Sequence, residues 1–152
     1  MLYETAVSLV VLVAVGAVGA VAWTLRARHL RKLDSYGIEP EILRGLLQPK
    51  ASVLLFDVRQ PLDVLAYSER IPGAQRISPK DILADPMLIP IDEDVVLYCT
   101  CEGQKTSREI IQRGLTLGFS RVRLLRGGLA AWKAKGYPVE PYKESFHLDT
   151  AV

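Results

Sequence analysis

The chain has 152 residues, which is enough for one domain of ordinary size and a short appended segment. Its formal net charge is +2, from 19 Lys and Arg against 17 Asp and Glu. Four of the bases lie in residues 26–32, so the rest of the chain is close to neutral, which excludes an extended nucleic-acid-binding surface. The two cysteines and the two histidines, His29 and His147, do not form a zinc-binding motif, and we expect neither a metal nor a cofactor.

An uncharged stretch, residues 5–25, follows a short N-terminal segment, residues 1–4. About twenty apolar residues in a helix span the ~30 Å hydrocarbon core of a bilayer, so the stretch predicts one transmembrane helix. A cleaved signal peptide is the main alternative, but the first four residues include no base. The basic flank, residues 26–37, is predicted to be a juxtamembrane linker on the cytoplasmic side. We therefore expect a single-pass protein of a bacterial inner membrane with a cytoplasmic C-terminal domain.

Residues 38–141 alternate between helical and strand-like patterns, and residues 142–152 look like an irregular tail. Short apolar runs predict buried strands, and apolar residues at helical spacing predict helices. This alternation predicts one α/β domain with a parallel sheet covered on both faces. In chain order we expect a helix at 39–47, a strand at 52–58, a helix at 62–67, a turn at 71–74, a strand at 75–77, a helix at 79–84, a strand at 94–99, a helix at 106–117, a strand at 121–125 and a helix at 129–135.

Cys99 ends the clearest of these strands and opens the loop before the helix at 106–117. Ligands of open α/β sheets bind beyond the carboxyl ends of the strands. Backbone N–H groups of such a loop, and the positive end of the following helix, stabilise a thiolate. We therefore expect Cys99 to be a nucleophile, although a small buried apolar residue is the alternative. The anion-binding loop would comprise Thr100, Cys101, Glu102, Gly103, Gln104 and Thr106, with Lys105 adding a positive charge.

Three stretches give the sequence a resemblance to the rhodanese family. Residues 55–61 (LFDVRQP) and 71–74 (IPGA) resemble the family's D-V-R-x-P and H-I-P-G-A signatures, and residues 96–99 (VLYC) resemble the V-Y-C before its active-site turn. Residues 125–139 (LRGGLAAWKAKGYPV) resemble L-x-G-G-x-x-x-W followed by G-x-P-V. The three stretches occur in the family's order within residues 39–140.

The resemblance implies a rhodanese-like three-layer domain with a five-stranded parallel sheet, preceded here by the transmembrane helix. It implies a sulfurtransferase in which Cys99 carries sulfane sulfur as a persulfide between a donor and a thiol acceptor. Lys105 stands where the family has an arginine. Asp57 and Arg59 are placed at the catalytic edge, where they either organise the site by charge pairing or form a purely structural ion pair.

The loop departs from the family pattern in length and charge. Five residues separate Cys99 from Lys105, where the family usually has four before its arginine. This length resembles the phosphatase and arsenate-reductase branch of the fold, but lysine lacks the bidentate fork that grips a tetrahedral oxyanion. Glu69 and Arg70 also replace the usual Gly-His before Ile-Pro-Gly-Ala.

We therefore predict a membrane-tethered sulfurtransferase. Two alternatives stay open: an inactive rhodanese-like binding or regulatory module, and a thiol-redox sensor that uses Cys99 and Cys101. The small residues Gly16 and Ala20, four positions apart, also predict a weak helix-mediated dimer.

Overall fold

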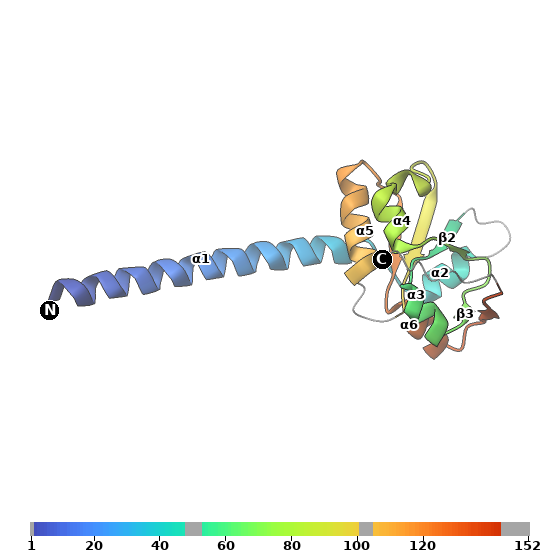
Figure 1. Cartoon of the computed structure of the whole chain (residues 1–152), viewed down its shortest axis with the longest axis horizontal. Coiled ribbons are helices and arrows are strands. Elements are labelled where there is room, and N and C mark those ends of the chain that lie inside the picture. Colours follow the sequence, from blue (N-terminus) through green and yellow to red (C-terminus); the bar gives the residue numbers. More distant parts are fainter. Residues whose placement is uncertain (1, 48–52, 101–104, 144–152) are drawn as a thin grey trace, which may run out of the picture. The chain divides into compact units, whose positions relative to one another are not determined.

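The computed structural model describes residues 2–47, 53–100 and 105–143, which fall into two units, residues 1–35 and 36–152. The first unit is a single helix, α1 (Leu2–Asp34), drawn in blue in Figure 1. The second is an α/β domain built on a five-stranded sheet. The two units are described separately below.

Helix α1 confirms the predicted helical conformation and corrects the predicted location. It continues without a break from the apolar stretch through the bases Arg26, Arg28 and Arg31, so apolar side chains make up only part of it. In the part of the chain that the structure describes, no helix has both the length and the apolar character that crossing a bilayer requires. This finding overturns the transmembrane helix at 5–25 and the single-pass inner-membrane location. Association through Gly16 and Ala20 stays a prediction.

The five strands of the main sheet all run parallel, as predicted. They are β1 (Gly37–Ile38), β2 (Val53–Asp57), β4 (Gln75–Arg76), β5 (Asp94–Tyr98) and β6 (Val122–Leu125), in the spatial order β1-β6-β5-β2-β4. The longest strands, β2 and β5, are neighbours, and most of their apolar residues are buried on both faces, as expected of a parallel sheet. A separate antiparallel pair joins β3 (Glu69–Arg70) to β7 (Glu140–Pro141).

The helices of the domain begin where the sequence supplies a suitable first residue. Proline, whose missing N–H is not needed in the first turn, opens α2 (Pro40–Leu46), α3 (Pro61–Ala66) and α4 (Pro79–Ala84). A short 3₁₀ turn, η1 (Pro86–Leu88), follows α4, and the longer helices of the second half are α5 (Lys105–Thr116) and α6 (Gly128–Ala134).

Alternation along the strands divides the core into two layers around the sheet. On one face, Leu55, Val96 and Leu125 pack with Leu43 of α2 and with Leu129 and Trp132 of α6. On the other face, Val122 of β6 lies with Ile82 of α4 and Ile110 of α5. The domain is therefore the three-layer α/β arrangement that the sequence pattern predicted.

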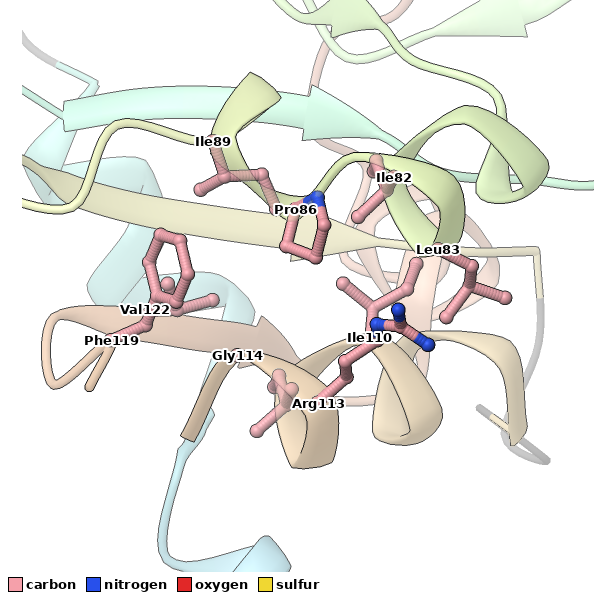
Figure 2. A pocket seen from close by; sticks show the side chains of 10 residues that line it. Ile82, Leu83, Pro86, Ile89, Ile110, Arg113, Gly114, Phe119 and Val122 are labelled. Carbon is pink, nitrogen blue, oxygen red and sulfur yellow. The ribbon is translucent and has the colours of Figure 1, made fainter. Parts of the chain in front are cut away.

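Figure 2 shows the second of these layers, where α4 and η1 face α5. Side chains of Ile82, Pro86 and Ile89 point toward Ile110 and Val122 across a crevice of about 10 Å³. That volume holds at most about one water molecule, and the walls are almost wholly apolar. The crevice is thus a packing gap of the core and too small for a ligand.

Predicted and observed boundaries agree closely, and the differences fall on short elements. The two-residue strands β1, β3 and β7 and the turn η1 were not predicted, because two residues carry no measurable periodicity. The structure also extends α1 to Asp34, through most of the predicted linker. Most of the predicted tail, residues 142–152, lies outside the described residues.

Trp132 offers a test of the layer formed by α2 and α6. Its side chain is 1% exposed, and its indole Nε1 donates a hydrogen bond of 2.8 Å to the carbonyl of Pro138. We expect Trp132→Ala to lower the free energy of unfolding by about 3–5 kcal/mol, from the cavity and the lost contacts. The measurement is urea denaturation followed by circular dichroism. The control is Leu62→Ala, a residue 72% exposed, with an expected change of about 0.5 kcal/mol or less. Equal effects at both positions would contradict the packing described.

Candidate functional site

Cys99 lies at the carboxyl edge of the sheet, immediately after its central strand β5. Its side chain is 8% exposed. Strand β2 ends beside it, since Asp57 is in register with Tyr98 and the Val58 N–H donates to the Tyr98 carbonyl at 3.0 Å. The structure therefore brings the predicted residues Cys99 and Asp57 to one edge, where parallel strands present their ligands.

The backbone of Cys99 is held by the start of α6. The Leu129 N–H donates to the Cys99 carbonyl at 2.8 Å, and the Ala130 N–H donates to the Thr100 carbonyl at 3.2 Å. Gly128 has a φ of +57°, and a Cβ placed there would lie 2.2 Å from the Cys99 carbonyl oxygen. Only glycine permits this approach, so Gly128 fixes where the cysteine backbone can lie.

A buried ion pair lies at the end of β2. The guanidinium Nη2 of Arg59 is 2.6 Å from Asp57 Oδ2, and both side chains are fully buried. Arg59 also donates hydrogen bonds of 2.8 Å to the carbonyls of Tyr67 and Glu69. A buried charge requires a partner and hydrogen bonds, and Arg59 has both. All three of its side-chain nitrogens are occupied by protein acceptors, so the guanidinium is not placed to bind a substrate.

Arg59 and Asp57 therefore act at this edge through hydrogen bonds to backbone groups, those of Tyr67 and Glu69 among them. Burial lowers the pKa of Arg59, but the hydrogen bonds and the charge of Asp57 outweigh burial and leave the pKa above its ordinary value. Arg76 of β4 adds a hydrogen bond of 2.9 Å to the Arg59 carbonyl and lies 4.0 Å from Asp57. The geometry thus favours a positioning role over direct contact with reacting atoms.

Tyr98 joins the cysteine strand to the Ile-Pro-Gly-Ala turn, and the sequence reasoning did not single it out. Its hydroxyl accepts a hydrogen bond of 3.3 Å from the Ile71 N–H. Burial and the negative charge of Asp57 raise the pKa of the phenol far above its ordinary value, so it stays neutral. Tyr98 could have been found from the sequence, because it lies directly before Cys99 in a buried strand, where a tyrosine hydroxyl needs a hydrogen-bond partner.

The remaining predicted loop residues divide into two groups. Lys105 and Thr106 are the first residues of α5, so they lie in the first turn of the helix instead of the loop. Cys101, Glu102, Gly103 and Gln104 lie outside the described residues. Within residues 2–47, 53–100 and 105–143, no three His, Cys, Asp or Glu side chains gather closely enough to bind a metal ion.

A cavity of about 500 Å³ lies next to Thr100, the residue that follows Cys99. Its other walls are Tyr67 and four residues of α6, namely Leu129, Ala130, Lys133 and Ala134. The volume is within the range of sites for small organic molecules. The sequence reasoning did not predict this cavity, because it forms between segments far apart in the chain.

Comparison with known proteins identifies the family of the domain that carries this edge of the sheet. Residues 39–135 match the rhodanese-like domain family. The chain belongs to this family. A sulfurtransferase of Allochromatium vinosum is 33% identical over 102 residues, which cover 67% of this chain and 92% of that protein. Family membership and this relative support a sulfurtransferase-type function for the rhodanese-like domain.

Solved structures agree on the fold. A protein of Lactobacillus plantarum has a TM-score of 0.65 at 22% identity, covering 77% of this chain and 98% of that one. A rhodanese-related protein of Thermoplasma volcanium has a TM-score of 0.57 at 19% identity, covering 68% of this chain and 96% of that one. These similarities place the domain in the rhodanese-like fold.

Removing Arg59 tests whether the buried pair holds this edge of the rhodanese-like domain together. We expect Arg59→Met to lower the free energy of unfolding by about 3–5 kcal/mol, because it leaves the Asp57 carboxylate buried without its partner. The control is Arg121→Met, which breaks an exposed pair with Asp94 and should cost about 0–1 kcal/mol. Both values come from chemical denaturation. Similar losses in the two variants would show that burial of the first pair is energetically unimportant.

Gly128 tests the close approach of α6 to Cys99. Gly128→Ala combines a left-handed φ with a clash against the Cys99 carbonyl, so we expect a loss of more than about 2 kcal/mol. Gly136→Ala is the matched control, since its φ is +70° but no atom lies within 4 Å of the added Cβ. There the loss should be about 1 kcal/mol, from backbone strain alone. Thermal or urea unfolding measures both, and a larger loss at Gly136 would contradict the contact.

Proposed function

We propose that this rhodanese-like domain is a sulfurtransferase that carries sulfane sulfur as a persulfide on Cys99. The observation that carries the proposal is the position of Cys99: it follows the central strand, its carbonyl accepts a hydrogen bond from α6, and the next residue, Thr100, lines a cavity. The similarity to a sulfurtransferase of Allochromatium vinosum supports the same chemistry.

Activation of the thiol is assigned to the segment between β5 and α5. Thiolate, and not thiol, is the nucleophile in sulfur transfer. Helix α5 has 12 residues and begins at Lys105, so its positive end and a lysine follow the loop. The backbone N–H groups of Thr100, Cys101, Glu102, Gly103 and Gln104 are proposed to surround the anionic sulfur, with Thr106 in the first turn behind them.

The reaction proceeds in two displacements, each at a sulfur–sulfur bond. The Cys99 thiolate attacks the outer sulfur of a donor such as thiosulfate, whose S–S bond breaks and releases sulfite with the electron pair. A nucleophilic acceptor then attacks the outer sulfur of the persulfide, and the electron pair returns to Cys99 Sγ. The cycle is balanced without an external oxidant or reductant. Asp57 and Arg59 contribute by holding the edge in place, and Cys101 is proposed to resolve or protect the persulfide.

The test is intact-mass spectrometry after incubation with thiosulfate or an inorganic polysulfide. One added sulfur gives a gain of about 32 Da, which should appear in the unaltered protein and be absent from Cys99→Ser, because the thiolate is the attacking group. Cys101→Ser is the matched control, with the same substitution two residues away, and it should still gain the mass.

Other outcomes decide between the remaining functions. A mass gain that survives Cys99→Ser and vanishes in Cys101→Ser would move the reactive sulfur to Cys101. No gain with either donor would overturn the proposal and leave a binding or regulatory role. A loss of about 2 Da on mild oxidation, abolished by either substitution, would indicate a Cys99–Cys101 disulfide and a redox sensor.

A further inference from the structure

Arg76 lies at the carboxyl end of β4, the edge strand next to β2. Its side chain is 10% exposed, which is unusual for an arginine. Within the described part of the chain its guanidinium makes its polar contacts through Nη1, which donates a hydrogen bond of 2.9 Å to the Arg59 carbonyl and lies 4.0 Å from Asp57 Oδ1. Nε and Nη2 have no acceptor among the described residues. A nearly buried guanidinium with unused N–H groups needs a further acceptor.

The charges at this edge are not balanced. Two guanidinium groups, those of Arg59 and Arg76, lie beside the carboxylate of Asp57. Both oxygens of that carboxylate already accept hydrogen bonds from Arg59. Asp63, in the first turn of α3, forms an ion pair with neither guanidinium in the described chain. Arginine keeps its proton in proteins, so the positive charge of Arg76 is permanent and attracts an anion.

The register of the strands places Arg76 near the cysteine. Asp57 of β2 is in register with Arg76 on one side and with Tyr98 on the other. Neighbouring strands lie about 4.8 Å apart, so β4 lies about 10 Å from β5. The Arg76 side chain crosses about half of that distance, because its Nη1 reaches the carbonyl of Arg59 beyond the end of β2. The remaining gap to the strand that leads to Cys99 is about 5 Å, which one small oxyanion can span.

Resting on the proposed function, we infer that Arg76 binds the oxygens of a thiosulfate-type donor and so selects oxyanion donors over donors made of sulfur alone. The Nε and Nη2 groups of a guanidinium point the same way and match two oxygens of a tetrahedral oxyanion. Because Nη1 is held by the Arg59 carbonyl, this fork is oriented before the donor arrives.

The contact would strengthen during the first displacement of the proposed cycle. The Cys99 thiolate attacks the outer sulfur, the S–S bond of the donor breaks, and its electron pair leaves with sulfite. In thiosulfate part of the negative charge resides on the outer sulfur, whereas in sulfite it resides on the oxygen-bearing group. Hydrogen bonds from Arg76 to those oxygens therefore stabilise the transition state more than the bound donor. A polysulfide has no oxygen at which this can occur.

The first experiment compares two donors by the rate of persulfide formation, followed by intact mass. Arg76→Gln removes the charge and the fork but keeps an N–H donor for the Arg59 carbonyl. We expect the rate constant with thiosulfate to fall about ten- to a hundredfold, the range for hydrogen bonds to a charged group. The rate constant with an inorganic polysulfide should change about twofold or less, because that anion meets only the screened charge.

The matched control is Arg123→Gln, which removes an exposed arginine of β6 and should change neither rate constant. An unchanged rate constant with thiosulfate in Arg76→Gln would show that Arg76 only supports the Arg59 carbonyl, and would overturn the inference. An equal fall with both donors would show a general effect on the edge and would overturn it as well.

A conservative variant tests the fork itself. Arg76→Lys keeps the positive charge but lacks the parallel N–H groups, so we expect it to recover only part of the rate constant with thiosulfate. Full recovery would show that charge alone suffices and would contradict the forked contact. Retained reactivity toward polysulfide in both variants is the internal check that the fold and Cys99 are intact.

A binding measurement separates failure of this inference from failure of the proposed function. Cys99→Ser lacks the attacking thiolate, so calorimetric titration with thiosulfate reports binding alone. Adding Arg76→Gln should raise the Kd for thiosulfate about tenfold, whereas adding Arg123→Gln should leave it unchanged. Binding that depends on Arg76 would sustain the inference even if no persulfide ever forms on Cys99. Persulfide formation from thiosulfate that is equally fast in Arg76→Gln would sustain the proposed function and overturn this inference.

Sulfate distinguishes a donor site from a site for a free anion. It carries the same kind of oxygens but no transferable sulfur, so it should displace thiosulfate from Cys99→Ser. Sulfate that binds at Arg76 without displacing thiosulfate would show a separate anion site and overturn the donor assignment.

Discussion

The structure of the sheet edge that carries Cys99 depends on the Arg59 guanidinium, which is buried without access to water. A buried guanidinium must find its acceptors inside the protein. Here it pairs with Asp57 and takes the carbonyls of Tyr67 and Glu69, so one side chain joins the end of β2 to the end of α3 and to β3. Glu69 is thereby fixed by its backbone while its carboxylate remains available to Lys133. The same contacts that stabilise the edge therefore position one wall of the cavity.

A second constraint acts on the opposite side of the cysteine. Strand β5 delivers Cys99 to the edge, and α6 approaches so closely that its first residue must be glycine. Trp132 anchors that helix in the core through its buried ring and its hydrogen bond to Pro138. Strand register on one side and helix packing on the other together fix the Cys99 backbone.

Much of this could be predicted from the sequence, because the strong signals are local. The apolar runs of β2 and β5 and the helical spacing of α5 and α6 give element type and order, and the alternation gives a parallel sheet. The position of Cys99 follows from the end of β5. The cavity could not be predicted, because Tyr67, Thr100 and Lys133 come from three separate segments. The bilayer-spanning helix predicted from the uncharged run at 5–25 is wrong, because no helix within the described residues is long and apolar enough to cross a bilayer.

The close contact between Gly128 and the Cys99 carbonyl bears on how the site can change. The carbonyls of Cys99 and Thr100 accept hydrogen bonds from the first residues of α6. A change in loop length after Thr100 therefore has to be accommodated between Thr100 and the start of α5. The unusual spacing of five residues between Cys99 and Lys105 is compatible with an unmoved cysteine. The backbone position of Cys99 and the length of the segment that follows Thr100 are therefore independent of each other, and segments of different length can follow the same cysteine.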